Sequence, residues 1–74
     1  MNIDEIIKEI KEGKSFTIAC SNYEQYFWFK DDAFYTSIEN GYCEGAPSKK
    51  DEAYVRRNIS IALHHPEEWD AMFE

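Results

Sequence analysis

The fold is decided by ten residues near the middle of the chain, Tyr26-Phe27-Trp28-Phe29-Lys30-Asp31-Asp32-Ala33-Phe34-Tyr35. Four consecutive aromatic residues, a polar turn and two more aromatics cannot all face one core, because successive side chains of a strand point to opposite sides. The stretch therefore predicts a hairpin with aromatic groups on both faces. A two-residue turn at Asp31-Asp32 predicts the cross-strand pairs Lys30–Ala33, Phe29–Phe34, Trp28–Tyr35 and Gln25–Ile38.

The residues before the hairpin, 15–21, alternate between apolar and small or polar side chains, which predicts a further strand. A turn that places Ser21 opposite Glu24 would pair Ile18 with Phe27 and Phe16 with Phe29. Both hairpins then sort their side chains onto the same two faces. The core face carries Phe16, Ile18, Cys20, Phe27, Phe29, Phe34 and Ile38, and the amphipathic face carries Thr17, Ala19, Tyr26, Trp28, Tyr35 and Ser37.

Helices are expected before and after these strands along the chain. Isoleucines at positions 3, 6, 7 and 10 follow a helical period over residues 3–12, with Asn2 as the N-cap and Gly13 as the stop. Ser48 is expected to cap a second helix that runs to His64, with Val55, Ile59, Ala62 and Leu63 buried. Residues 66–74 are expected to form a short helix that begins at Pro66, with Trp69, Met72 and Phe73 on one side.

Residues 39–47 are predicted to form turns and a loop, in which a short strand near Tyr42-Cys43 is an option. The sequence thus predicts one α+β domain over residues 1–74. Its architecture is a three-stranded antiparallel meander sheet with an N-terminal helix and C-terminal helices, in the order α-β-β-β-α-α.

The charge of the chain argues against nucleic acid as a partner. The net charge is −7, and residues 20–46 and 66–74 each carry −4, whereas residues 47–65 carry +2. Nucleic-acid binders are recognised by basic patches, so an acidic chain favours basic partners instead. A solubilising role for the same charge is the common alternative.

The two cysteines, Cys20 and Cys43, are too few for the disulfide framework of a small secreted domain, so we interpret them as free thiols. Asp4 and Glu5 stand where a signal peptide would be basic, and no apolar run approaches the roughly 20 residues that span a bilayer. We expect a cytoplasmic protein without membrane contact.

No catalytic or metal-binding pattern is present, and we expect neither an enzyme nor a cofactor. His64 and His65 are adjacent and point about 100° apart on a helix, so they cannot chelate one ion together. Cys20 is predicted in the core, and a Cys43–His64 pair would be needed for nucleophilic catalysis. Asp31-Asp32 sits on a hairpin tip without a cleft that could raise a carboxyl pKa.

The amphipathic face, with Tyr26, Trp28 and Tyr35, has the side chains of an RNA-stacking platform but not its charge, since Lys30 is the one basic residue in 20–46. Tyrosine and tryptophan are also the residues that dominate protein interfaces. Two alternatives stay open: the C-terminal helix covers this face, or the face binds a partner. The candidate partner-binding residues are Glu24, Tyr26, Trp28, Asp31, Asp32, Tyr35, Glu39 and Glu44.

In size, acidity and layout the chain resembles the small inhibitor proteins of phages and mobile elements, anti-CRISPR proteins in particular. The resemblance implies a non-enzymatic protein that imitates DNA and blocks a basic nucleic-acid-binding surface of a CRISPR-Cas or other nucleoprotein complex. The alternative is a structural or regulatory module that homodimerises through the aromatic face.

Overall fold

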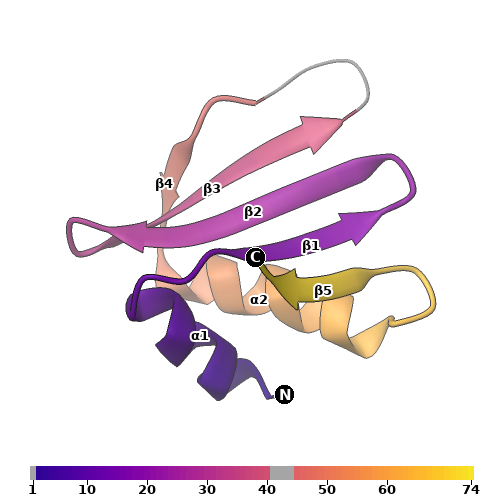
Figure 1. The fold of residues 1–74 in the computed structure, drawn as a ribbon, viewed down its shortest axis with the longest axis horizontal. Coiled ribbons are helices and arrows are strands. Elements are labelled where there is room, and N and C mark those ends of the chain that lie inside the picture. Colours follow the sequence, from indigo (N-terminus) through magenta and orange to yellow (C-terminus); the bar gives the residue numbers. More distant parts are fainter. Residues whose placement is uncertain (1, 41–44) are drawn as a thin grey trace.

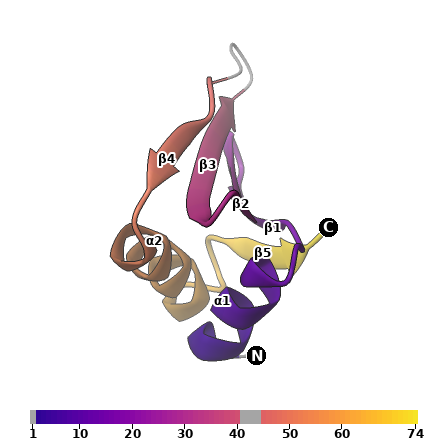
Figure 2. The same ribbon diagram turned by 90° about the vertical axis from the view of Figure 1, so that its left-hand side faces the viewer.

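A computed structural model describes residues 2–40 and 45–74 of the chain, which form a strongly twisted antiparallel sheet and two helices (Figure 1). The elements in chain order are α1 (Ile3–Lys11), β1 (Phe16–Cys20), β2 (Tyr23–Lys30), β3 (Ala33–Asn40), β4 (Ser48–Lys50), α2 (Glu52–His64) and β5 (Asp70–Phe73). The strand order across the sheet is β4-β3-β2-β1-β5. Both helices lie on one side of it (Figure 2). The α+β class and the β1-β2-β3 meander are confirmed, but the described sheet has five strands and not three.

The central hairpin, β2 and β3, forms in the predicted register. Lys30 pairs with Ala33, Trp28 with Tyr35 and Gln25 with Ile38. Asp31 and Asp32 both have positive φ, 50° and 63°, as a two-residue turn that matches the right-handed twist of its strands requires. Aspartate tolerates this region better than most residues, which is why the turn forms without glycine.

The predicted β1–β2 register is wrong by two residues. Phe16 lies opposite Phe27 and Ile18 opposite Gln25, because the chain turns at Ser21-Asn22 and pairs Cys20 with Tyr23. A shift of two residues leaves every side chain on its predicted face, whereas a shift of one would have reversed them. The division into two faces therefore holds despite the register error.

The core lies between the sheet and the helices. Its buried apolar members on the sheet include Phe16, Ile18, Phe27 and Phe34. The helices contribute Ile6, Ile7, Ile10, Val55, Ile59 and Ala62, and Leu63 packs at the edge. The predicted stripes of both helices are thus confirmed.

Two polar residues, Gln25 and Thr36, are also buried on the core face, at 1% and 2% exposure. The Gln25 amide donates to Thr36 Oγ1 at 3.0 Å and to the Tyr54 hydroxyl at 3.3 Å, and Thr36 donates to the Tyr26 carbonyl at 2.8 Å. These bonds offset the loss of water that makes a buried amide unfavourable. The network ties α2 to β2 and β3 through a specific contact.

The first helix has the ends that the sequence predicts. The Glu5 amide donates to Asn2 Oδ1 at 2.9 Å, and the Asn2 side chain donates back to Glu5 Oε1 at 2.9 Å. Gly13 follows the helix with a φ of 110°, a conformation in which glycine is favoured.

The predicted start of the second helix at Ser48 is wrong. Ser48, Lys49 and Lys50 form the edge strand β4, and α2 begins at Glu52 with Asp51 as its N-cap. The Asp51 side chain accepts a hydrogen bond from the Tyr54 amide at 2.8 Å. A helix that began at Ser48 would place two lysines at its positive end, whereas lysines on an edge strand discourage pairing with other chains.

Removal of the Asp51 side chain should therefore destabilise the start of α2. We expect Asp51→Ala to lower the free energy of unfolding by about 1 kcal/mol, because the Tyr54 backbone amide in the first turn loses its side-chain acceptor. Ser48→Ala should change it by less than about 0.5 kcal/mol. Urea denaturation of both variants measures this, and a larger effect at Ser48 would contradict the assigned start of α2.

The predicted C-terminal helix is also wrong. Residues 66–68 form a turn, and β5 pairs with β1, so that Phe73 lies opposite Phe16 and Met72 opposite Thr17. The Phe73 and Phe16 rings meet edge to face, with centroids 4.8 Å apart. The free edge of β1 offers a ladder of backbone partners that a helix of so few residues cannot match. The predicted short strand near Tyr42-Cys43 lies outside the described residues.

Because residues 70–73 form a strand, Met72 and Phe73 point to opposite faces and should contribute differently to the free energy of unfolding. Phe73 points to the core, while Met72 points to the other face and is 50% exposed. We expect Phe73→Ala to lower the free energy of unfolding by about 2 kcal/mol, and Met72→Ala by less than about 0.5 kcal/mol. Thermal and urea denaturation measure both values. Equal losses would instead fit the helix that groups Met72 and Phe73 on one side.

Candidate protein-binding face

One face of the sheet, here called the open face, points away from both helices (Figure 2). Strand alternation and the observed pairing place on it Thr17, Ala19, Glu24, Tyr26, Trp28, Lys30, Tyr35, Ser37, Glu39, Lys49, Asp70 and Met72. No helix within residues 2–40 and 45–74 covers this face. The cover that the sequence allowed, a C-terminal helix, does not form, and its aromatic residues Trp69 and Phe73 pack against the core instead.

The centre of the open face is an aromatic pair. Trp28 and Tyr35 are direct cross-strand partners, and their rings are stacked with centroids 6.1 Å apart and 15° between the planes. Both side chains are half-buried by their neighbours and keep an exposed surface. The pair thus offers a flat apolar area with polar edges, the kind of surface that anchors protein interfaces.

Beside the pair, Tyr26 stands between two carboxylates that lie directly opposite each other, Glu24 on β2 and Glu39 on β3. The Tyr26 hydroxyl donates to Glu24 Oε2 and lies 3.1 Å from Glu39 Oε2. A phenol has one proton, so it can serve only one of these acceptors at a time. The bond to Glu24, then burial and then the bond to Glu39, raises the pKa of Tyr26 above its usual value.

The acidic groups of the open face lie in one row across the strands. Asp70 is opposite Ala19, Ala19 is opposite Glu24, and Glu24 is opposite Glu39. Like charges directly opposite each other are unfavourable in a sheet. Between Asp70 and Glu24, the row is interrupted by the small, uncharged side chain of Ala19.

The predicted site residues therefore do not form one acidic patch. Asp31 and Asp32 occupy the hairpin tip, and Asp31 is seven residues from Glu24, which is roughly 23 Å along a strand. Lys30 and Lys49 lie on the open face toward that tip. Glu44 lies outside the described residues.

Three cations on the helical side of the molecule are engaged with other acids. Lys11 pairs with Glu52 at 2.8 Å and Lys14 with Glu9 at 2.6 Å. Arg56 Nη1 lies 2.8 Å from Asp4. Within residues 2–40 and 45–74, neither Glu24 nor Glu39 has an ion pair with a basic side chain. No basic side chain of the described chain thus occupies the two opposed carboxylates, and both face solvent where an external cation can bind.

The sequence prediction misses three residues of the open face. It assigns Lys49, Asp70 and Met72 to helices, although the alternation of Asp70, Ala71, Met72 and Phe73 is the period of a strand. Thr17 is predicted on this face but without a role. It is 6% exposed, and its hydroxyl has no hydrogen-bond partner in the part of the chain that the structure describes.

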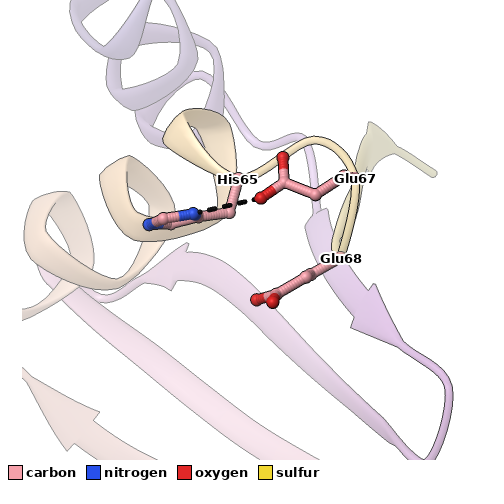
Figure 3. Close-up of side chains that lie close together, drawn as sticks. All are labelled: His65, Glu67 and Glu68. Carbon is pink, nitrogen blue, oxygen red and sulfur yellow. Dashed lines mark hydrogen bonds and ion pairs between the residues drawn. The ribbon is translucent and has the colours of Figure 1, made fainter.

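A second group of polar side chains lies at the turn after α2 (Figure 3). Ligand atoms of His65, Glu67 and Glu68 fall within 4.8 Å of one another, and His65 Nδ1 lies 3.3 Å from Glu67 Oε1. Its own backbone amide and then His65 lower the pKa of Glu67. All three residues are exposed, so the turn gives a metal ion none of the enclosure or supporting contacts of a built site.

The other sequence candidates for chemistry are not brought together. His64 does not join this cluster, because its Nδ1 lies 2.7 Å from the Ser60 carbonyl. Cys20 is a free, half-buried thiol at the end of β1. The alternative of a Cys43–His64 pair concerns a residue outside the described ranges.

Comparison of the chain with protein-family models, with curated proteins and with solved structures finds no significant match. Neither helix of the described chain is long and apolar enough to cross a membrane. The open face therefore carries the functional argument.

The raised pKa of Tyr26 leads to a titration test. Its phenol is more easily ionised in the unfolded chain, where the pKa is about 10, than in the fold. The stabilising effect is complete below pH 10 and is lost as the pH rises through the higher folded value. We expect stability to fall more steeply above about pH 10 in the wild type than in Tyr26→Phe.

Urea denaturation at stepwise pH, with ultraviolet absorbance of tyrosinate in the folded state, measures this difference. Tyr35→Phe is the matched control, since it removes a phenol from the same face and should keep the late-titrating component. Identical pH profiles for Tyr26→Phe and the wild type would contradict the assigned contacts.

Proposed function

We propose that this chain is a non-enzymatic binding protein whose open face docks on a basic surface of another protein. In its specific form, the partner is a nucleoprotein complex of a host defence system, and the chain acts as an anti-CRISPR-like inhibitor of phage or mobile-element origin in the cytoplasm. The observation that carries the proposal is the uncovered aromatic pair Trp28–Tyr35 beside a row of carboxylates.

The two kinds of group have separate roles in such a complex. Glu24, Glu39 and Asp70 attract a basic surface over several ångströms and repel phosphate backbones, which favours protein over nucleic acid. Trp28 and Tyr35 bury apolar area on contact, and this controls how long the complex lasts. A carboxylate row that occupies a basic groove also excludes the nucleic acid from it, which is the physical basis of inhibition by imitation.

The hairpin tip supplies a second acidic point to the proposed contact. Asp31 and Asp32 are exposed and project beyond the sheet, where Lys30 and Lys49 reduce their effect on the local potential. The proposed binding surface is therefore elongated along β2, with acids at both ends and the aromatic pair in the middle.

The proposal is tested by competition. Immobilised chain is incubated with a purified CRISPR effector complex, and the bound complex is challenged with its labelled target DNA. We expect DNA and chain to exclude each other, and Trp28→Ala to weaken binding about tenfold or more, through faster dissociation. Glu24→Gln with Glu39→Gln should slow association and reduce its dependence on salt.

The matched control is Ile61→Ala, because Ile61 is an exposed apolar residue on α2, away from the open face. It should bind as the wild type does. A folded Trp28→Ala variant that binds with unchanged affinity would refute the proposed surface, and simultaneous binding of DNA and chain would refute inhibition by occlusion.

Homodimerisation through the same face is the second candidate, and one observation favours it. Lys30 and the pair Glu24–Glu39 lie at opposite ends of the face. If two copies met face to face with their strands reversed, each Lys30 would approach the carboxylates of the other copy. Sedimentation velocity over a range of concentrations distinguishes the candidates, since an inhibitor monomer shows no concentration dependence.

A further inference from the structure

Two independent observations show that polar groups of the open face lack a full set of hydrogen-bond partners within the described chain. The first is the opposed pair Glu24–Glu39, which shares the single proton of the Tyr26 hydroxyl. At least one of the two carboxylates therefore always lacks this donor, in a position where the facing charge is unfavourable.

The second observation concerns Thr17 on the neighbouring strand β1. It lies directly opposite Tyr26, so its side chain belongs to the same face. It is 6% exposed, and its buried hydroxyl has no hydrogen-bond partner in the described chain. A buried hydroxyl without a partner is unfavourable, so the strand next to Tyr26 also carries an unsatisfied polar group.

We infer that the open face holds an arginine side chain of its partner, with the guanidinium against Glu24 and Glu39 and the apolar stem over the Tyr26 ring, toward the Trp28–Tyr35 stack. The inference rests on the proposed function and names the group that the face recognises. A guanidinium has five N–H donors in a rigid planar fork, so it can serve two carboxylates at once. It also stacks on aromatic rings, and it loses less hydration than a lysine ammonium does.

The arginine comes from a foreign chain and not from this protein. The sequence contains two arginines, Arg56 and Arg57, and both lie on α2, on the far side of the sheet. Arg56 bonds to Asp4 and Glu52, and the Arg57 guanidinium lies 5.7 Å from the centre of the Tyr54 ring. If a second copy bound through its own open face, the only cations that it could offer from the described residues of that face are lysines, Lys30 and Lys49.

The test compares two synthetic peptides of equal charge, hexa-arginine and hexa-lysine, titrated into the full chain by calorimetry and by amide NMR at 0.15 M salt. We expect hexa-arginine to bind at least fivefold more tightly, with shifts at Glu24, Glu39 and the Trp28 indole. Glu24→Gln with Glu39→Gln should weaken hexa-arginine at least tenfold and remove the preference for arginine.

The charge-matched control is Glu12→Gln with Glu68→Gln, two exposed acids away from the open face. It should keep the arginine preference. Equal affinity for both peptides, or equal loss in the control, would overturn the inference while the proposed docking on a basic protein could still hold. Conversely, the expected peptide result without any exclusion of DNA from the effector complex would refute the proposed function and leave arginine recognition in place.

Glutamine variants could also lose binding by unfolding, so their thermal midpoints are measured alongside. We expect the midpoint of the Glu24→Gln, Glu39→Gln variant to be no lower than that of the wild type, because the substitution removes a facing pair of like charges. A large fall in the midpoint would show that the pair is structural and would count against a recognition role.

Discussion

The structure depends on one constraint, the alternation of side chains along β2. This strand has hydrogen-bonded neighbours on both sides, and it carries aromatic groups toward the helices and away from them. Phe27 is fully buried under the helices, while Tyr26 and Trp28 on either side of it point outward. Because the alternation has a period of two, burial of Phe27 forces its two neighbours to the open face.

The helices could not bury both faces of this sheet. Two short helices pack side by side on the core face, and the chain has no further helix within its described residues to cover the other. A chain of this size buries a limited share of its surface, so one sheet face is commonly left to solvent or to a partner. The aromatic content of that face, and not its openness, is the unusual property.

The charged groups are arranged differently on the two sides of the sheet. Ion pairs such as Lys11–Glu52 and Arg56–Asp4 connect α1 with α2 on the helical side of the molecule. On the open face, Glu24 and Glu39 instead oppose each other around Tyr26. The facing like charges are unfavourable, and hydrogen bonding by the Tyr26 hydroxyl offsets part of this cost in the fold.

The periodic features can be predicted from the sequence: the isoleucine helix with its caps, the Asp31-Asp32 hairpin and its register, and the two faces of the sheet. These depend on neighbours within a few residues, where side-chain spacing is sufficient. The remaining features depend on contacts between distant segments. Ser48–Lys50 and Asp70–Phe73 became strands because β3 and β1 had free edges for them, a contact between segments far apart in sequence. Because residues 70–73 form β5 and not a covering helix, Tyr26, Trp28 and Tyr35 lie on an open face. The row of Asp70, Glu24 and Glu39 results from pairing across four strands.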